Sequence, residues 1–250
     1  MAPGPRDAAT VVLLRDGPGG IETLLIRRAL TMAFAPGMYV FPGGRVDEGD
    51  YARVVEFVAD DAHRLAARAS SDAAGIAALY SCAVRETLEE VDVDLAPLSD
   101  DGRLVIDPAR LPLLDHWVTP DVETKRYDVR FFVAELPPAS RPRLVTTEAD
   151  LATWLTPAEA LRGFTSGELP MLPPTLAVLH YLEDFSSSTA VVASADGRPI
   201  VPLLPRRIVD ADGGVRWVMV NARTDEVLVA DARAPHASEV EGVLGFRDRS

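Results

Sequence analysis

Arg85-Glu86-Thr87-Leu88-Glu89-Glu90-Val91-Asp92-Val93 is the segment from which the fold and the chemistry of this sequence are predicted. It places three carboxylates in a segment whose pattern predicts a helix from residue 73 to about 90. At about 100° per residue, Glu86, Glu89 and Glu90 project from one side of that helix. Adjacent like charges repel, and a divalent cation with oxygen ligands removes the repulsion. The helix alone leaves two interpretations open, a solvated acidic face and a metal site.

The opposite side of this helix carries an apolar stripe that we expect to face the core: Tyr80, Val84, Leu88 and Val91. The preceding Ser-Ser-Asp at 70–72 can cap its first turn. A second helix is predicted over 51–69, because apolar residues recur there at near-helical spacing.

The composition is that of a globular protein with a sizeable core, since 48% of the 250 residues are hydrophobic. A net charge of −13 argues against a nucleic-acid-binding surface, although a bound metal can supply positive charge for a polyphosphate. Cys82 is the only cysteine, so we expect no disulfide and a cytoplasmic location. We expect no membrane span and no secretory signal, because residues 1–9 and the rest of the sequence lack the apolar runs that these need.

Apolar, β-branched runs between Gly-rich turns predict strands at 8–14, 22–27, 38–41, 114–118 and 127–136. Helices are predicted from a capping box at Thr156 and Glu159, and over 175–185. After a serine run at 186–188, further strands are expected at 189–193, 200–204, 215–220 and 226–230. Strands and helices in no strict alternation favour an α+β fold with a mixed sheet over a doubly wound parallel sheet.

A Gly-Gly turn after a strand, followed by a Glu-rich helix, resembles the Nudix hydrolase family, whose motif runs Gly-x5-Glu-x7-Arg-Glu-U-x-Glu-Glu-x-Gly-U, with U bulky and apolar. Gly44 matches the first glycine, and Asp50 stands where the family usually has Glu. Residues 85–93 match every charged position, while Thr87 replaces an apolar residue and Asp92 the second glycine. Positions 51–84 make 34 residues where the pattern has seven, so 27 are inserted.

Split motifs of this kind occur in a branch that is similar to coenzyme A diphosphatases. That branch also has a Leu-Leu-x-x-Arg…Gly-x-Val-Phe-Pro-Gly-Gly lead-in, close to residues 24–44. The resemblance covers roughly 8–185 and implies a Nudix α/β/α sandwich at 1–185, with an insertion at about 51–76 and a β-rich C-terminal extension at 186–250. An insertion on the surface costs little closure entropy.

The resemblance implies hydrolysis of a pyrophosphate in a nucleoside diphosphate-linked substrate, with water as nucleophile and Mg²⁺ or Mn²⁺ as cofactor. Coenzyme A or an acyl-CoA is the first candidate, and ADP-ribose, NADH and nucleoside triphosphates remain open. A Nudix fold that only binds a nucleotide is the alternative from another class. The presence of all three helix glutamates argues against that alternative.

The predicted metal site consists of Glu86, Glu89, Glu90 and a carbonyl of the Gly-Gly turn, Gly44 or Gly43. Glu89 is a candidate for a third ligand or for the general base. The predicted catalytic residues are Glu89, Glu86, Arg85 and Glu148.

Arg85 is expected to orient Glu89 and to pair with Asp50, although an ordinary i,i+4 surface pair explains it as well. Glu148 is expected as a further catalytic acid, in competition with Glu123 and Asp150, and a solvated loop acid is the alternative interpretation.

Arg27 and Arg28, together with Gly43 and Gly44, are the predicted substrate-binding residues. Solubilising charge at a strand end explains the two arginines nearly as well.

The remaining candidates have structural interpretations. We expect Cys82 to be inert and Trp154 to pack in the core, with base stacking left open. The four histidines lack ligand spacing and are interpreted as structural: His63, His116, His180 and His236. The extension either forms a homodimer, closes over the substrate or packs on its own chain.

Overall fold

The computed structural model describes residues 4–58, 62–96, 98–209 and 215–232. Its strands are β1 (Arg6–Gly17), β2 (Gly20–Arg28), β3 (Tyr39–Val40), β4 (Gly43–Arg45), β5 (Val55–Phe57), β6 (Leu104–Ile106), β7 (Leu113–Val118), β8 (Tyr127–Glu135), β9 (Ala149–Leu155), β10 (Leu203–Val209), β11 (Val215–Asn221) and β12 (Val227–Ala232). Its helices are α1 (Glu48–Ala52), α2 (Ala62–Arg68), α3 (Ala73–Val91), α4 (Pro157–Thr165), α5 (Pro173–Leu182) and α6 (Ser188–Ala195).

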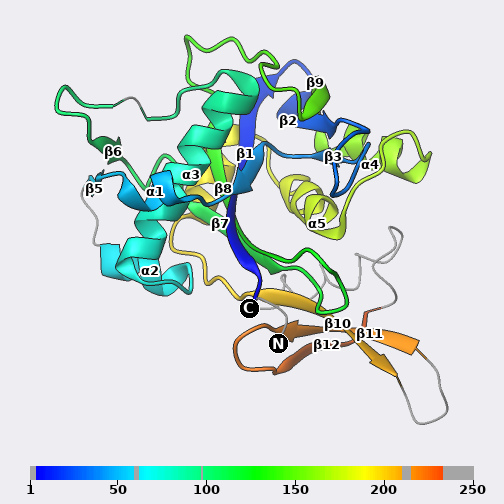
Figure 1. The fold of residues 1–250 in the computed structure, drawn as a ribbon. Coiled ribbons are helices and arrows are strands. Elements are labelled where there is room, and N and C mark those ends of the chain that lie inside the picture. Colours follow the sequence, from blue (N-terminus) through cyan, green and yellow to red (C-terminus); the bar gives the residue numbers. More distant parts are fainter. Residues whose placement is uncertain (1–3, 59–61, 97, 210–214, 233–250) are drawn as a thin grey trace.

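The main sheet is mixed and has the order β12-β11-β10-β7-β8-β1-β2-β3, with β4 paired to β1 and β9 paired to β2. β1 runs parallel to β8 and antiparallel to β2. Helix α3 covers one face, and α4 and α5 lie on the other (Figure 1). This arrangement confirms the predicted α+β sandwich with a mixed sheet.

The acidic helix forms where the sequence predicts it, with Asp72 as its N-cap. Its buried side differs from the expected stripe, because Thr87 is buried and Leu88 is exposed. Around the helix axis Thr87 lies within about 20° of Tyr80, whereas Leu88 lies about 80° away. The Thr87 hydroxyl donates a 2.7 Å hydrogen bond to the Ala83 carbonyl, which satisfies it inside the core.

The helix predicted over 51–69 is wrong. A short helix, α1, begins at a capping box between Asp47 and Asp50. β5 follows and pairs in parallel with β6, and α2 occupies only the end of the predicted range. The β-branched segment around Val55 pairs with a strand far along the chain. Local periodicity does not reveal a partner at that distance in the sequence.

The strand predicted at 189–193 is also wrong, because helix α6 occupies this segment with Ser187 as its N-cap. Its Val191 and Ala195 belong to the core cluster under α4 and α5. β10 joins the main sheet at a Leu203–Trp117 pair, which confirms a strand-containing C-terminal region. The division into domains at 185/186 and the bounds of the insertion at about 51–76 stay predictions.

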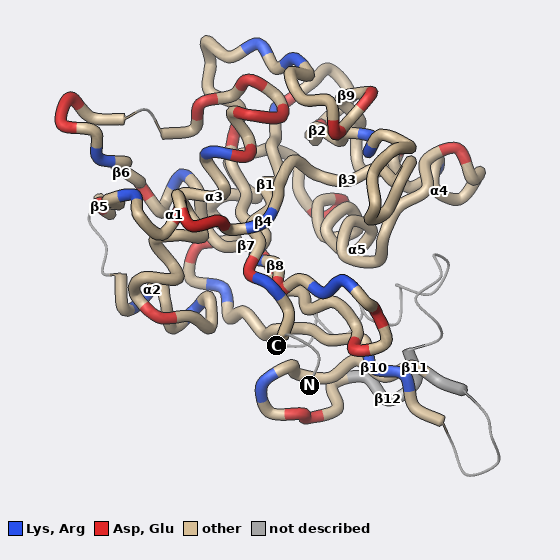
Figure 2. Tube along the Cα trace, viewed as in Figure 1, with Lys and Arg blue, Asp and Glu red and all other residues tan. Residues whose placement is uncertain are grey.

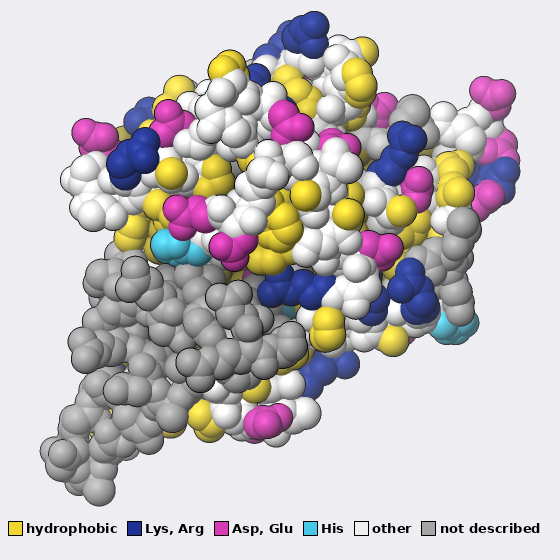
Figure 3. All heavy atoms as spheres, turned by 180° about the vertical axis from the view of Figure 1, so that it is seen from behind, with side chains coloured by type: hydrophobic (Ala, Val, Ile, Leu, Met, Phe, Trp, Pro, Cys, Tyr) yellow, Lys and Arg dark blue, Asp and Glu magenta, His cyan; other side chains and the backbone are white. Residues whose placement is uncertain are grey.

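Charged segments of both signs gather where α1, β4 and α3 meet (Figure 2). On the face seen in Figure 3, acidic and basic side chains of the described residues interleave with hydrophobic ones. None of the helices in the described part of the chain is long and apolar enough to cross a membrane.

Candidate active site

The two halves of the split motif meet in space at Gly43 and Gly44, which begin strand β4 and do not form the turn that the sequence predicts. The Gly43 amide donates a 2.8 Å hydrogen bond to Oε2 of Glu90, across 47 positions of sequence. A Cβ added to Gly44 would lie 2.3 Å from Oε1 of Glu86, so the carboxylate packs directly against this glycine. A Cβ at Gly43 would lie 2.4 Å from the Ala9 carbonyl oxygen. Gly43 therefore requires glycine, whereas a side chain at Gly44 would displace the Glu86 carboxylate.

Arg85 connects the loop half of the motif to the helix half. It binds Asp50 through two hydrogen bonds, 3.1 Å from Nε and 2.7 Å from Nη2. Its Nη1 donates to Glu86 at 2.8 Å and to Glu89 at 3.1 Å. Burial opposes the charge of Arg85, but its bonds to Asp50 and the charge of Glu86 raise the Arg85 pKa above its ordinary value. Arg85 is therefore held by buried partners and is more than an i,i+4 surface pair.

Asp50 is only 1% exposed and takes the position of the family's usual Glu. Besides Arg85, it accepts a 3.0 Å bond from the Ser81 hydroxyl and a 3.1 Å bond from the Asp47 amide. Sequence reasoning missed Ser81, which no motif position marks. The Asp47–Asp50 pair could have been found as a capping box of two acidic residues three positions apart.

Glu90 is 5% exposed and Glu86 is also largely enclosed, so two carboxylates share a poorly solvated site. Burial raises the pKa of Glu90 to about 8; the charge of Glu86 adds to the shift, and the Gly43 hydrogen bond opposes it. Burial likewise raises the pKa of Glu86 above its ordinary value, against the attraction of Arg85. Two neighbouring carboxylates in such a poorly solvated site are stabilised either by a proton on one of them or by a bound cation.

The other predicted site residues do not all lie near Glu86 and Glu90. Glu89 has 58% of its side chain exposed and turns toward Arg85. Glu148 lies close enough to raise the Glu90 pKa by its charge, while Arg28 lowers it. Arg27 is on the other face of the sheet, bound to Asp150 at 2.7 Å. The structure thus brings Arg28 and Glu148 to the glutamates and separates Arg27 from them.

The alternating faces of β2 explain this separation. Leu24 and Ile26 belong to the core beneath α3, whereas Ile21 and Leu25 belong to the core beneath α4 and α5. Arg28 continues the first set and Arg27 the second, because successive side chains of a strand point to opposite faces. The competing acids also lie elsewhere: Glu123 follows Pro120 in the β7–β8 connection, and Asp150 is occupied by Arg27.

The surroundings of Cys82 and His116 indicate that both residues have structural roles. The Cys82 thiol is buried, donates a 3.5 Å bond to the Gly44 carbonyl, and has its pKa raised by burial. His116 is 1% exposed and contacts Asp128 through Nε2. His236 lies outside the described residues.

The donor set fits a divalent cation in part. Glu86 and Glu90 supply hard oxygen donors whose mutual repulsion a cation would relieve. Within the described residues no three acidic, His or Cys side chains converge as a metal-binding group. Glu89 is the member of the predicted set that points elsewhere, toward Arg85.

Comparisons with known proteins agree with this site. No family model matches the chain. The crystal structure of a Nudix hydrolase from Alicyclobacillus acidocaldarius is 30% identical and superposes with a TM-score of 0.64, covering 77% of this chain and 97% of that chain. The acyl-coenzyme A diphosphatase NUDT19 of Gallus gallus is 24% identical over 293 residues, covering 84% of this chain and 77% of that protein.

The mixed sheet between helical layers, and a glutamate helix held against the glycine pair of β4, define an enzyme of the pyrophosphohydrolase class. The insertion between the motif halves does not prevent their contact. The chain belongs to the Nudix hydrolase family, and within it resembles coenzyme A diphosphatases.

Proposed function

We propose that this enzyme is a metal-dependent hydrolase that cleaves the diphosphate of a nucleoside diphosphate-linked substrate. The observation that carries this proposal is the buried Glu90 beside the largely enclosed Glu86, both packed against Gly43 and Gly44 of β4. Coenzyme A or an acyl-CoA is the first candidate substrate, supported by similarity to an acyl-coenzyme A diphosphatase. ADP-ribose, NADH and nucleoside triphosphates are the competing substrates.

Glu86 and Glu90 would hold Mg²⁺ or Mn²⁺, with a carbonyl of Gly43 or Gly44 as a further oxygen donor. The bound metal would supply positive charge to the diphosphate and lower the pKa of the attacking water. Arg85 keeps the Glu86 carboxylate against Gly44 through its 2.8 Å hydrogen bond. Because Arg85 is itself fixed by Asp50, the glutamates stay oriented without a ligand.

Glu89 is our candidate for the group that removes a proton from the attacking water. Its carboxylate is exposed and lies one turn from Arg85, so it can reach a water outside the buried pair. Glu148 is the competing base, because it lies near Glu90 at the start of β9. Arg28 would contact the substrate phosphates from the same face.

The test is hydrolysis of a substrate panel with Mg²⁺: coenzyme A, octanoyl-CoA, ADP-ribose, NADH and nucleoside triphosphates. We expect turnover of the coenzyme A compounds, a loss of at least ~100-fold in kcat for Glu89→Gln, and an unchanged rate for Glu183→Gln, at the exposed C-cap of α5. If nothing in the panel is cleaved and Glu89→Gln changes only binding, the chain is a nucleotide-binding protein instead.

Metal binding needs its own measurement. Calorimetric titration of Mn²⁺ into the protein should show binding that the Glu86→Gln/Glu90→Gln double variant loses and Glu183→Gln keeps. Equal binding by the double variant would place the metal elsewhere.

Two further proposals concern the whole protein. The free thiol of Cys82 supports a cytoplasmic location. Homodimer formation through residues 186–250 is tested by sedimentation of the full chain, with a monomer at micromolar concentration as the contrary result.

A further inference from the structure

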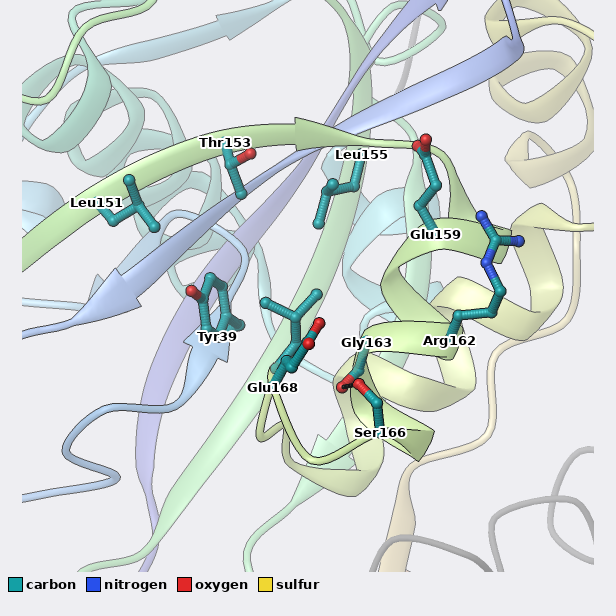
Figure 4. Close-up of a pocket in the computed structure, with 10 residues that line it drawn as sticks. Tyr39, Leu151, Thr153, Leu155, Glu159, Arg162, Gly163, Ser166 and Glu168 are labelled. Atoms are coloured by element: carbon teal, nitrogen blue, oxygen red, sulfur yellow. Dashed lines mark hydrogen bonds between the residues drawn. The ribbon is translucent and has the colours of Figure 1, made fainter.

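A cavity lies on the face of the sheet opposite the glutamate helix. Its wall is β9, from which Leu151, Thr153 and Leu155 project toward Tyr39 and helix α4 (Figure 4). These alternate residues span about 13 Å along the strand. The cavity is open to solvent on one side and has a volume of about 480 Å³, within the ~300–1,000 Å³ of small-molecule sites.

The lining chemistry favours an uncharged occupant. Along β9 the wall is aliphatic apart from the Thr153 hydroxyl, and Leu169 faces it from the loop after α4. Three exposed charged side chains also line the cavity, Glu159, Glu168 and Arg162, and the two acids outnumber the arginine, which disfavours a phosphate. The apolar wall contributes affinity by burial of aliphatic surface.

The cavity and the proposed diphosphate site lie near the same end of β2, on opposite faces of the sheet. Arg27 is paired with both Leu151 and Tyr39, so it lies between two lining residues. Its neighbour Arg28 lies on the face of Glu90. Tyr39 precedes Gly43 by four residues, which limits their Cα separation to about 14 Å.

The first residues of β9 also lie near the glutamates of α3. β9 begins at Ala149, directly after Glu148, whose charge acts on Glu90. A chain attached to a diphosphate at Glu90 can therefore pass around the sheet end and enter between β9 and α4.

We propose that this cavity binds the uncharged aliphatic and amide-containing arm attached to the diphosphate, as in an acyl-pantetheine group, and sets the preference for acyl length. The inference rests on the proposed function, because the arm must belong to a substrate held at Glu86 and Glu90. The nucleotide half of the substrate then stays on the side of α3.

The first experiment measures kcat and KM for coenzyme A and its butyryl, hexanoyl and octanoyl esters with Mg²⁺. Each methylene buried in the cavity should lower KM by up to about fourfold until the cavity is full, with kcat unchanged. Thr153→Phe fills the cavity from a strand position that tolerates aromatic residues, so it should remove the dependence of KM on acyl length. Thr224→Phe, in the exposed β11–β12 turn, is the matched control.

Ser166→Phe fills the same cavity from an exposed position after α4 and covers the case in which Thr153→Phe does not fold. An unchanged acyl-length dependence in whichever variants fold overturns the proposal. It is also overturned if Thr153→Phe raises KM equally for coenzyme A and ADP-ribose, because the occupant would then be the shared nucleotide.

The second experiment separates this proposal from the proposed function. S-hexanoyl-pantetheine, which has no diphosphate, is titrated calorimetrically into the wild type, Thr153→Phe and Thr224→Phe. Binding lost only in Thr153→Phe supports the cavity even if no coenzyme A compound is hydrolysed. No binding to the wild type overturns the cavity proposal even if coenzyme A compounds are hydrolysed.

Discussion

Replacing Glu90 by Gln should stabilise the metal-free protein while it weakens metal binding. The Glu90 carboxyl has its pKa raised from 4.5 to about 8 by burial, so the folded protein holds this proton more tightly than the unfolded chain. The stability conferred by the proton is complete below about pH 4.5 and is lost as the pH rises through about 8. The amide side chain introduced by Glu90→Gln is neutral at every pH and keeps a carbonyl oxygen that can accept the Gly43 N–H.

The size of the Glu90 pKa shift sets the expected change in the free energy of unfolding. Compared with a side chain that stays neutral, Glu90 lowers the free energy of unfolding by about 1 kcal/mol at pH 5.5, about 3 kcal/mol at pH 7 and between about 4 and 5 kcal/mol at pH 8.5, because the unfolded chain ionises this group more easily. Glu90→Gln should increase the free energy of unfolding by these amounts.

The assay is urea unfolding at those three pH values after treatment with a chelator, followed by tryptophan fluorescence. Glu89→Gln is the matched control, because this side chain is 58% exposed and should show no comparable gain. Added Mg²⁺ should stabilise the wild type and not Glu90→Gln. A Glu90→Gln protein that is less stable than the wild type, or whose gain does not grow with pH, would refute the reasoning.

Three further predictions concern the motif. Gly44→Ala places a Cβ 2.3 Å from Oε1 of Glu86, so kcat should fall at least ~100-fold with a normal far-ultraviolet spectrum; near-normal kcat would show that the Glu86 position does not matter. Asp50→Asn leaves Arg85 without its buried charge partner, and urea unfolding should show a loss of about 3 kcal/mol; a loss below ~1 kcal/mol would contradict a structural role. Asp92 ends α3 with φ 57°, so Asp92→Val should lower stability by ~1–2 kcal/mol and Asp92→Gly should not; equal losses would point to its side chain instead.

The extent of sequence-based prediction differs between elements for physical reasons. Helix α3 and the capping box of α4 were predicted correctly, because helical periodicity and caps are local signals. The segment around Val55 was predicted as helix and forms β5, because its partner β6 lies about fifty positions further on. The segment at 189–193 was predicted as a strand and forms α6, where Ser187 caps a helix packed on the core.

The candidate site shows the same division. The residue types at Gly44, Glu86 and Glu90 were readable from the sequence, since their spacing forms a motif. The side chains of Arg27 and Arg28 lie on opposite faces of the sheet. This becomes evident only once the strand β2 and the helices that cover it are known. The pocket beside β9 had no sequence signal, because its walls come from three separate segments.

The carboxylate helix and an acidic partner for Arg85 follow from the sequence alone, whereas the glycine pair predicted as a turn begins strand β4. Local spacing fixes which side chains share a helix face, and a glycine pair marks a close backbone approach. The tertiary structure decided which carboxylates are buried. Glu90 faces Gly43 and has a raised pKa, while Glu89 stays in solvent beside Arg85. Burial depends on what packs against a helix from distant parts of the chain, and here that part is the Gly43 amide, 47 positions away.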